Sequence, residues 1–486
     1  MLKQQAFAAT LWSGIDVVFR QLVQLAVMML LARLLSPSEY GTFGLILLFA
    51  GIATVFADGG FSAALIQRQD IDRIDESTVF WFNLAAGFAA ACCLFAIAPA
   101  VARFYQQPVL VPLMGAMSIN VLFGAAGSIQ TSLLTKRLDF RTQWKVGLAS
   151  TFASGALAIW VAWHGFGVWA LAWQAVSATL VSTVLLWWLG GWRPLLAFSR
   201  VSARKLLGFG GYHFVSILMD MAYTRLYTVP IGKFIGVAEL GYYTNADTTQ
   251  QMPGGLLMRV LTRVAFPMFA AAHHDKAKLK RGMQLAIRGA MVIHAPAMLG
   301  MAALTEPLVR VLFGDRWLPV VPVLRILCLA GVLLPLHVLN LNCLMAQGHS
   351  RLMLRLELVK KTIGVALLVL GIRFGLQGVA WAMVVTSAVG LIVNAHYTRL
   401  LVGYGVGAQV RDFLPIILSA AVMAMVVATI SPAFEFSPLV RLICLAAIGG
   451  VIYGMLMLLT GSDAFHDVVA LVRGPAGVVR GAGDPR

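Results

Sequence analysis

Four polar side chains recur every three or four residues inside a long apolar segment near the start of the chain: Ser13, Asp16, Arg20 and Gln24. Because helical residues at this spacing share one face, they are predicted to form a polar stripe along a helix. Each charge inside a membrane span costs at least ~2.5 kcal/mol, so the stripe is expected to line a bundle interior or a water-filled cavity. The plainer alternative is that Asp16 and Arg20 pair only with each other.

A second polar stripe follows 200 positions later and consists of His213, Ser216, Asp220 and Thr224. The same offset relates residues 33–43 to residues 233–243, where Glu39, Gly41 and Phe43 return as Glu239, Gly241 and Tyr243. The offset spans six apolar segments, so both copies keep one orientation and are predicted to form two lobes related by an axis along the membrane normal. This organisation favours a substrate path between the lobes.

The least apolar predicted span covers residues 238–265, and its polar residues include Asn245, Asp247, Gln250 and Gln251. A lipid-facing helix cannot expose so many polar groups, so this span is expected to face protein or water. Pro253, followed by two glycines, predicts a kink or a discontinuity. Arg259 and Arg263 share one face at the cytoplasmic end, where they either reach the membrane interface or bind an anionic headgroup.

Two further charges lie in apolar segments. Arg225 lies off the stripe of segment 207–231, near its predicted outer half. Asp58 precedes Gly59 and Gly60, a pair that permits either a close helix approach or a kink. Asp58 is interpreted either as a helix cap or as a partner of Arg20.

The composition excludes a soluble protein. Of the 486 residues, 60% are hydrophobic and only 12% are charged. A spanning helix needs roughly 20 apolar residues, which predicts an all-α integral membrane protein with about fourteen transmembrane helices. The predicted segments are 8–32, 41–66, 78–102, 108–134, 145–163, 166–190, 207–231, 238–265, 283–304, 318–346, 357–373, 376–400, 411–431 and 438–460.

The repeat also predicts how these segments are grouped. Residues 1–200 would form an N-terminal lobe and residues 201–405 a C-terminal lobe, each with six helices. Residues 406–460 would add two further helices, and residues 461–486 would form a cytoplasmic tail.

The net charge of +17 does not indicate a nucleic-acid partner. When the N-terminus is taken as cytoplasmic, most of the 37 Lys and Arg residues fall at cytoplasmic helix ends and loops. This is the positive-inside pattern, so both termini are expected in the cytoplasm. The basic ends are expected to contact anionic membrane lipids.

Catalytic motifs are absent from the sequence. It has no nucleotide-binding loop and no nucleophile elbow, so uphill transport would need an ion gradient, and otherwise the substrate runs downhill. The acids within predicted spans are the candidates for ion coupling: Asp16, Asp58, Asp220 and Asp247. The five cysteines lie in apolar runs without metal-ligand spacing, so neither a metal nor a cofactor is expected.

Four passages of the chain resemble the polysaccharide transporter family, the Wzx-type flippases of the MOP superfamily. They are the stretch from Trp12 through Ala32 to Gly41, and the passages Asp58–Gln67, Leu240–Ala246 and Arg263–Pro267. The resemblance extends over most of the chain, and these motifs mark the family without naming a substrate.

The resemblance implies a two-lobed transporter of the bacterial inner membrane. It would flip an undecaprenyl-diphosphate-linked oligosaccharide to the periplasmic leaflet by alternating access, with a polysaccharide polymerase and export machinery as possible partners. Arginine suits the diphosphate through its planar donor fork, and amide side chains suit sugar hydroxyls. The predicted substrate-binding residues are Arg20, Gln24, Arg225, Asn245, Gln250, Gln251, Arg259 and Arg263.

Two alternatives stay open. A multidrug or cation antiporter of the same fold would have a cavity dominated by carboxylates and aromatic rings, which Arg20 and the amide-rich span 238–265 disfavour. A membrane glycosyltransferase or polysaccharide polymerase would place catalytic residues on a large outer loop. The largest predicted outer loop, residues 305–317, is short.

Overall fold

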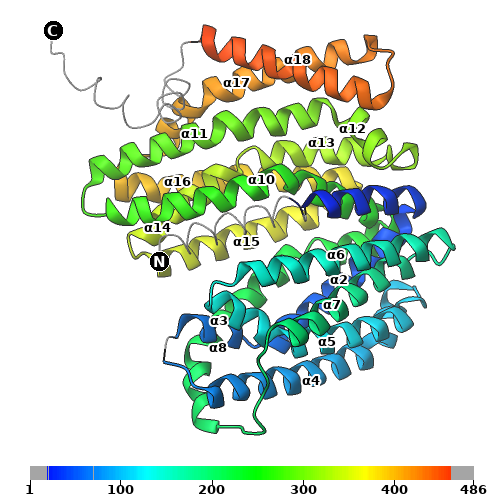
Figure 1. The fold of residues 1–486 in the computed structure, drawn as a ribbon. Coiled ribbons are helices and arrows are strands. Elements are labelled where there is room, and N and C mark those ends of the chain that lie inside the picture. Colours follow the sequence, from blue (N-terminus) through cyan, green and yellow to red (C-terminus); the bar gives the residue numbers. More distant parts are fainter. Residues whose placement is uncertain (1–18, 20, 69, 461–486) are drawn as a thin grey trace. The chain divides into compact units, whose positions relative to one another are not determined.

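The protein is all-α throughout the residues that its structure, a computed structural model, describes, namely 19, 21–68 and 70–460 (Figure 1). Ten helices in this part of the chain are long and apolar enough to cross a membrane. The chain is therefore a multi-pass membrane protein, and the predicted fold class is confirmed.

The helices follow one another with short connections. The first described helix covers Gln21–Leu34. It is followed by α2 (Pro37–Asp58), α3 (Phe61–Gln67), α4 (Arg73–Tyr105), α5 (Leu110–Lys136), α6 (Phe140–Trp163), α7 (Trp169–Leu189), α8 (Arg200–Thr224), α9 (Thr228–Pro230) and η1 (Ile231–Ile235). The rest of the chain forms α10 (Val237–Ala271), α11 (Lys276–Ala303), α12 (Thr305–Leu312), η2 (Asp315–Trp317), α13 (Val320–Gly331), α14 (Leu334–Ala346), α15 (Ser350–Ile372), α16 (Gly375–Val402), α17 (Val406–Ile430), η3 (Ser431–Ala433) and α18 (Pro438–Leu459).

Three further helices, α8, α10 and α15, are long enough to cross a membrane but are not among the ten spans. Each of them overlaps a predicted segment. Part of the first predicted segment, 8–32, lies outside the described residues. The total of fourteen spans therefore stays a prediction.

The predicted span 41–66 is divided into two helices, α2 and α3. The chain turns at Gly59 and Gly60, which both have left-handed φ angles of 56° and 78°. Glycine adopts this conformation readily because it has no Cβ atom. A Cβ atom on Gly60 would also overlap the carbonyl oxygen of Gly210 in α8. The glycine pair thus permits both a helix break and a close helix approach.

The starts of α2 and α10 repeat the 200-position offset, because these helices begin at Pro37 and Val237. Their first turns lie against each other. A Cβ atom on Gly41 would overlap the carbonyl oxygen of Val237, and a Cβ atom on Gly241 would overlap that of Pro37. Such a reciprocal contact is what two segments related by a local twofold axis make.

Contacts divide the chain into two compact units, residues 1–241 and 242–486. In the first unit, α8 packs against α2, α3 and α4. In the second unit, α11 packs against α17, and α16 packs against α13, α14 and α15. The predicted lobe boundaries after residues 200 and 405 stay predictions, and the predicted tail, 461–486, lies outside the described residues.

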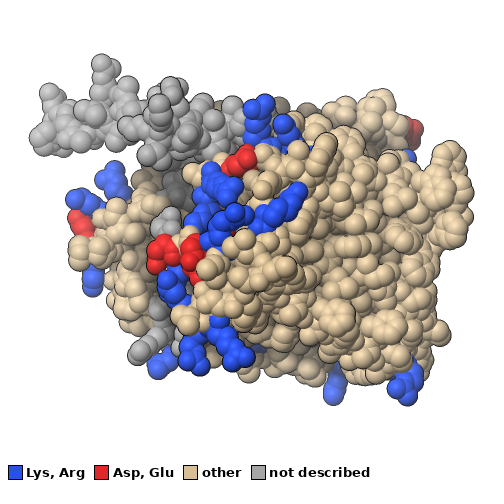
Figure 2. Space-filling model, turned by 60° about the horizontal axis from the view of Figure 1, so that its bottom comes forward, with Lys and Arg blue, Asp and Glu red and all other residues tan. Residues whose placement is uncertain are grey.

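Contacts within the first unit agree with the predicted sides of the membrane. The Lys136 Nζ atom donates to the carbonyl oxygen of Arg68 (2.6 Å), and Lys205 forms a salt bridge with Asp70 (3.4 Å). All four residues belong to loops or helix ends predicted to be cytoplasmic. Figure 2 shows that Lys and Arg side chains gather on part of the molecular face, next to a broad area that carries almost no charge.

Candidate functional site

A polar face runs along α8 in the first unit. Ser216, Asp220 and Thr224 are exposed and follow one another at intervals of four residues, so they lie in one line on the helix. The side chain of His213, the fourth member of the predicted stripe, lies outside the described residues. This face gives α8 its polar character.

The corresponding stripe near the start of the chain is described only in part. Gln24 is exposed on the helix Gln21–Leu34. Asp16 and Arg20 lie outside the described residues. Their roles in substrate binding and ion coupling therefore stay predictions.

The polar residues of α10 are divided between two faces in the second unit. Asn245 and Gln250 are 1% and 9% exposed, so they are packed inside this unit. The Gln250 Nε2 atom lies 3.6 Å from the Met298 sulfur, and its amide packs against Gly331. Thr249 donates to the carbonyl oxygen of Asn245 (2.7 Å). These predicted substrate-binding residues thus have surroundings typical of helix packing.

The other polar face of α10 is accessible. Thr248 and Gln251 are exposed, and Asp247 is half-buried. The Gln251 Nε2 atom donates to the Asp247 Oδ2 atom (2.9 Å). This carboxylate and amide pair is the part of the predicted site that the second unit leaves open to a ligand.

α10 continues through Pro253 to Ala271, so a discontinuity at Pro253 is excluded, while the kink that was predicted as the alternative stays a prediction. Proline removes only one backbone donor, and in a membrane helix neighbouring groups compensate for that loss. Gly254 packs closely against His294, whose Nε2 atom is 2.9 Å from the carbonyl oxygen of Gly331. The side chains of Arg259 and Arg263, further along α10, lie outside the described residues.

Asp58 is the last residue of α2 and has a local partner. Its Oδ1 atom accepts a hydrogen bond from the Ser62 hydroxyl, across the break between α2 and α3. This contact joins the two helices across the break, and both interpretations of Asp58, as a helix cap or as a partner of Arg20, stay predictions. Its proposed partner Arg20 lies outside the described residues.

Arg225 directly follows α8 as its C-cap residue and is half-buried. Its side chain lines a cavity of about 590 Å³ together with Phe104 and Tyr105 of α4. Among the described residues, no acidic side chain forms a salt bridge with Arg225. A guanidinium group in such an apolar position attracts an anion.

The second unit contains a buried polar network that was not predicted from the sequence. The side chains of Asn340 (α14) and Gln409 (α17) exchange two hydrogen bonds of 3.0 and 2.9 Å. Thr398 (α16) donates to the Asn340 Oδ1 atom (2.7 Å). All three residues are 0% exposed. The sequence feature that could have indicated this network is the presence of single polar residues inside the apolar segments 318–346 and 376–400.

A charged pair lies near one end of this network. Arg288 of α11 and Asp412 of α17 form a salt bridge of 2.6 Å, and the Tyr404 hydroxyl donates to the same carboxylate (2.6 Å). The Gln409 amide in turn donates to the carbonyl oxygen of Tyr404 (3.2 Å). The network thus joins α11, α14, α16 and α17.

The described residues include no group of three His, Cys, Asp or Glu side chains that could hold a metal ion. Outside the spans, Asp275 caps the start of α11. Hydrogen bonds from the backbone amides of Lys278 and Ala277 hold the pKa of this carboxyl below its usual value. The perturbed carboxyl thus has a structural role at a helix end.

Comparisons with known proteins place these features in context. Residues 30–322 match a family described as polysaccharide biosynthesis protein. The teichuronic acid biosynthesis protein TuaB of Bacillus subtilis is 27% identical, covering 94% of this chain and 96% of its own length. The succinoglycan biosynthesis transport protein ExoT of Rhizobium meliloti is 28% identical, covering 91% of each chain. A solved structure of the lipid II flippase MurJ has a TM-score of 0.75 at 17% identity, covering 94% of this chain and 100% of its own.

Proposed function

Because the chain belongs to the polysaccharide biosynthesis protein family, we propose that it is a flippase for a lipid-linked oligosaccharide. The resemblance found in the sequence is thereby confirmed at the level of the family. The substrate that we propose is an undecaprenyl-diphosphate-linked oligosaccharide, moved from the cytoplasmic to the periplasmic leaflet of the inner membrane. Both termini would be cytoplasmic, and a polysaccharide polymerase and export machinery would receive the product.

The observation that supports this proposal is an accessible polar face on each of two otherwise membrane-embedded helices. α8 has Ser216, Asp220 and Thr224, and α10 has Asp247 and Gln251. Hydroxyl and amide groups suit sugar hydroxyls, which both donate and accept hydrogen bonds. Among the described residues, these side chains are better placed for a ligand than the packed Asn245 and Gln250.

The rival functions have less support. An antiporter of the same fold remains compatible with the architecture, but both relatives above are named for polysaccharide biosynthesis and cover more than nine-tenths of the chain. A polymerase would build its catalytic site outside the membrane. The segment between α11 and α13 carries only the short elements α12 and η2.

Depletion of the protein in a producing strain tests the proposal. We expect lipid-linked repeat units to accumulate on the cytoplasmic face of the membrane, because synthesis continues while translocation stops. Accumulation on the periplasmic face would instead indicate a polymerase. Unchanged lipid-linked units and unchanged surface polysaccharide would exclude both functions.

Arg20 allows a sharper test of the site. If it binds the diphosphate, Arg20→Ala abolishes export and Arg20→Lys restores only part of it, because an ammonium group loses the bidentate geometry. The double variant Asp16→Asn with Arg20→Gln has no unpaired charge left in this stripe. Full export by the double variant would show that Arg20 only neutralises Asp16. Surface polysaccharide and membrane protein level are measured for each variant.

A further inference from the structure

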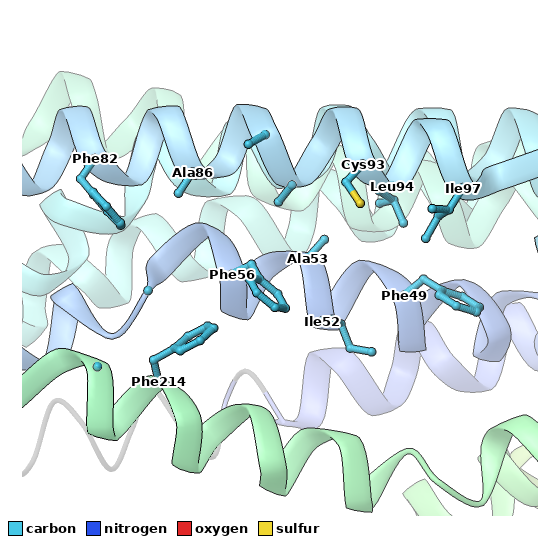
Figure 3. Close-up of a pocket in the computed structure, with 14 residues that line it drawn as sticks. Phe49, Ile52, Ala53, Phe56, Phe82, Ala86, Cys93, Leu94, Ile97 and Phe214 are labelled. Carbon is cyan, nitrogen blue, oxygen red and sulfur yellow. The ribbon is translucent and has the colours of Figure 1, made fainter. Parts of the chain in front are cut away.

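An apolar groove lies inside the first unit between α2, α4 and α8. Its volume is about 570 Å³, and Figure 3 shows side chains of these three helices that point into it. Phe56 of α2, Phe82 of α4 and Phe214 of α8 surround one end. Ala86 and Ala90 of α4 leave space between the rings. The groove is open at its side, since Phe56 is 47% exposed.

The cavity beside Arg225 lies next to the groove. Phe49 and Ile52 of α2 line both spaces, and the α4 residues that line the cavity follow those that line the groove, so the two spaces lie end to end along α4. Lining residues on α4 run from Phe82 to Phe104. At 1.5 Å per residue this distance is about 33 Å, which matches the hydrocarbon thickness of a bilayer, about 30 Å. A phospholipid chain fills only one leaflet, or about half of that length.

The adjoining cavity, on the side predicted to be periplasmic, has polar groups. It is lined by Arg225 and Tyr105. Tyr105 is only 6% exposed, and its hydroxyl has no hydrogen-bond partner among the described residues. Buried hydroxyl groups normally have a partner, so this orphan donor points to a ligand. Lys233 lies close by, with its Nζ atom 4.5 Å from the centre of the Phe104 ring.

We propose that this groove holds the polyisoprenoid chain of the lipid-linked substrate, and that Arg225 binds the adjoining phosphate once the headgroup has reached the periplasmic side. The inference rests on the proposed function and adds a lipid subsite to it. A polyisoprenoid is long enough to occupy a groove that crosses both leaflets, and the alanines leave space for its methyl branches. Arg225 and Lys233 supply the charge that a phosphate requires.

Lipid binding to the purified full-length protein tests this inference. Undecaprenyl diphosphate is the ligand, phosphatidylglycerol is the competitor, and native mass spectrometry measures the bound fraction. Ala90→Trp fills the groove. Ala85→Trp is the matched control, because Ala85 is exposed on the same helix but does not line the groove. We expect Ala90→Trp to lose most of the binding and Ala85→Trp to bind like the wild type.

The role of the Arg225 charge in phosphate binding is tested with Arg225→Gln, and Arg373→Gln is the control. Both arginines are C-cap residues at helix ends predicted to be periplasmic, but Arg373 lies in the second unit. Loss of one charge-assisted hydrogen bond weakens binding by about tenfold. We expect that loss for Arg225→Gln only.

Three outcomes would overturn the subsite: no binding of undecaprenyl diphosphate by the wild type, equal displacement by phosphatidylglycerol, or unchanged binding by Ala90→Trp. Complementation of a strain that lacks its own flippase is measured in parallel. Export by the wild type together with unchanged binding by Ala90→Trp would reject the groove and leave the proposed function standing. Absence of export by the wild type would reject the proposed function itself.

Discussion

The interiors of the two units differ in kind. The first unit contains an apolar groove of about 570 Å³ between α2, α4 and α8. The second unit is joined by the buried hydrogen bonds of Asn340, Thr398 and Gln409 and by the Arg288–Asp412 salt bridge. Satisfied polar networks hold helices in one arrangement, whereas an apolar groove leaves space for a guest. The two units of one chain thus differ in how firmly their helices are held together.

The largest effect is expected where the repeated passages meet. Gly41→Ala and Gly241→Ala each place a Cβ atom on a backbone oxygen, which side-chain movement cannot relieve. We expect a loss of about 3 kcal/mol of stability, at the upper end of the usual cost of overpacking, or no folded protein. Gly289→Ala in α11 is the control, since a Cβ atom there has open space around it. Yield and thermal unfolding in detergent measure the effect; equal stability of all three variants would contradict the reciprocal contact.

The second-largest loss of stability is expected at the charged pair of the second unit. Asp412→Ala leaves Arg288, whose side chain is 18% exposed, without this carboxylate, so we expect a loss of up to about 3 kcal/mol in unfolding free energy. Arg288→Met combined with Asp412→Leu removes both charges and recovers much of the loss. An unfolding temperature that is unchanged by Asp412→Ala would show that this salt bridge does not hold the second unit together.

A smaller effect is expected within the neutral part of the network. Gln409→Ala leaves the Asn340 side chain without two of its hydrogen bonds in a fully buried place. The expected cost is about 1–3 kcal/mol. Asn340→Leu combined with Gln409→Leu replaces both amides by apolar groups and should cost less than the single change. The same unfolding measurement applies, and the reverse order would contradict this prediction.

The smallest effect concerns the groove. Phe56→Ala removes a large ring, but the ring is 47% exposed and borders an existing cavity, so we expect a cost below about 1 kcal/mol. Phe269→Ala in the second unit is the control. Phe269 is 0% exposed in a packed core, and its loss should cost about 3–5 kcal/mol. Equal costs would show that the groove is packed as tightly as a core.

Much of the fold was predictable, because apolar runs of membrane length and glycine pairs have direct structural consequences. The close approach of α8 to Gly60 and the polar face of α8 are examples, whereas the division of the predicted span 41–66 into two helices was not predicted. Helical periodicity does not reveal which face packs inward, so Asn245 and Gln250 could not be separated from Asp247 and Gln251. The network around Asn340 could not be predicted either, since its members come from helices far apart in the chain. The groove is lined by residue types that also fill ordinary cores.

The contact between Gly41 and Gly241 has a consequence for how this chain can evolve. Duplicated segments ordinarily drift apart, because each adapts to its own surroundings. Here the two copies pack against each other. A Cβ atom on Gly41 would lie 3.0 Å from the Gly241 nitrogen, and one on Gly241 would lie 3.1 Å from the Gly41 nitrogen. A larger residue at either position would disturb the packing of both, so selection constrains the two positions together. A lineage that gains a larger residue at one of them has to separate the two helices before either position is free to vary.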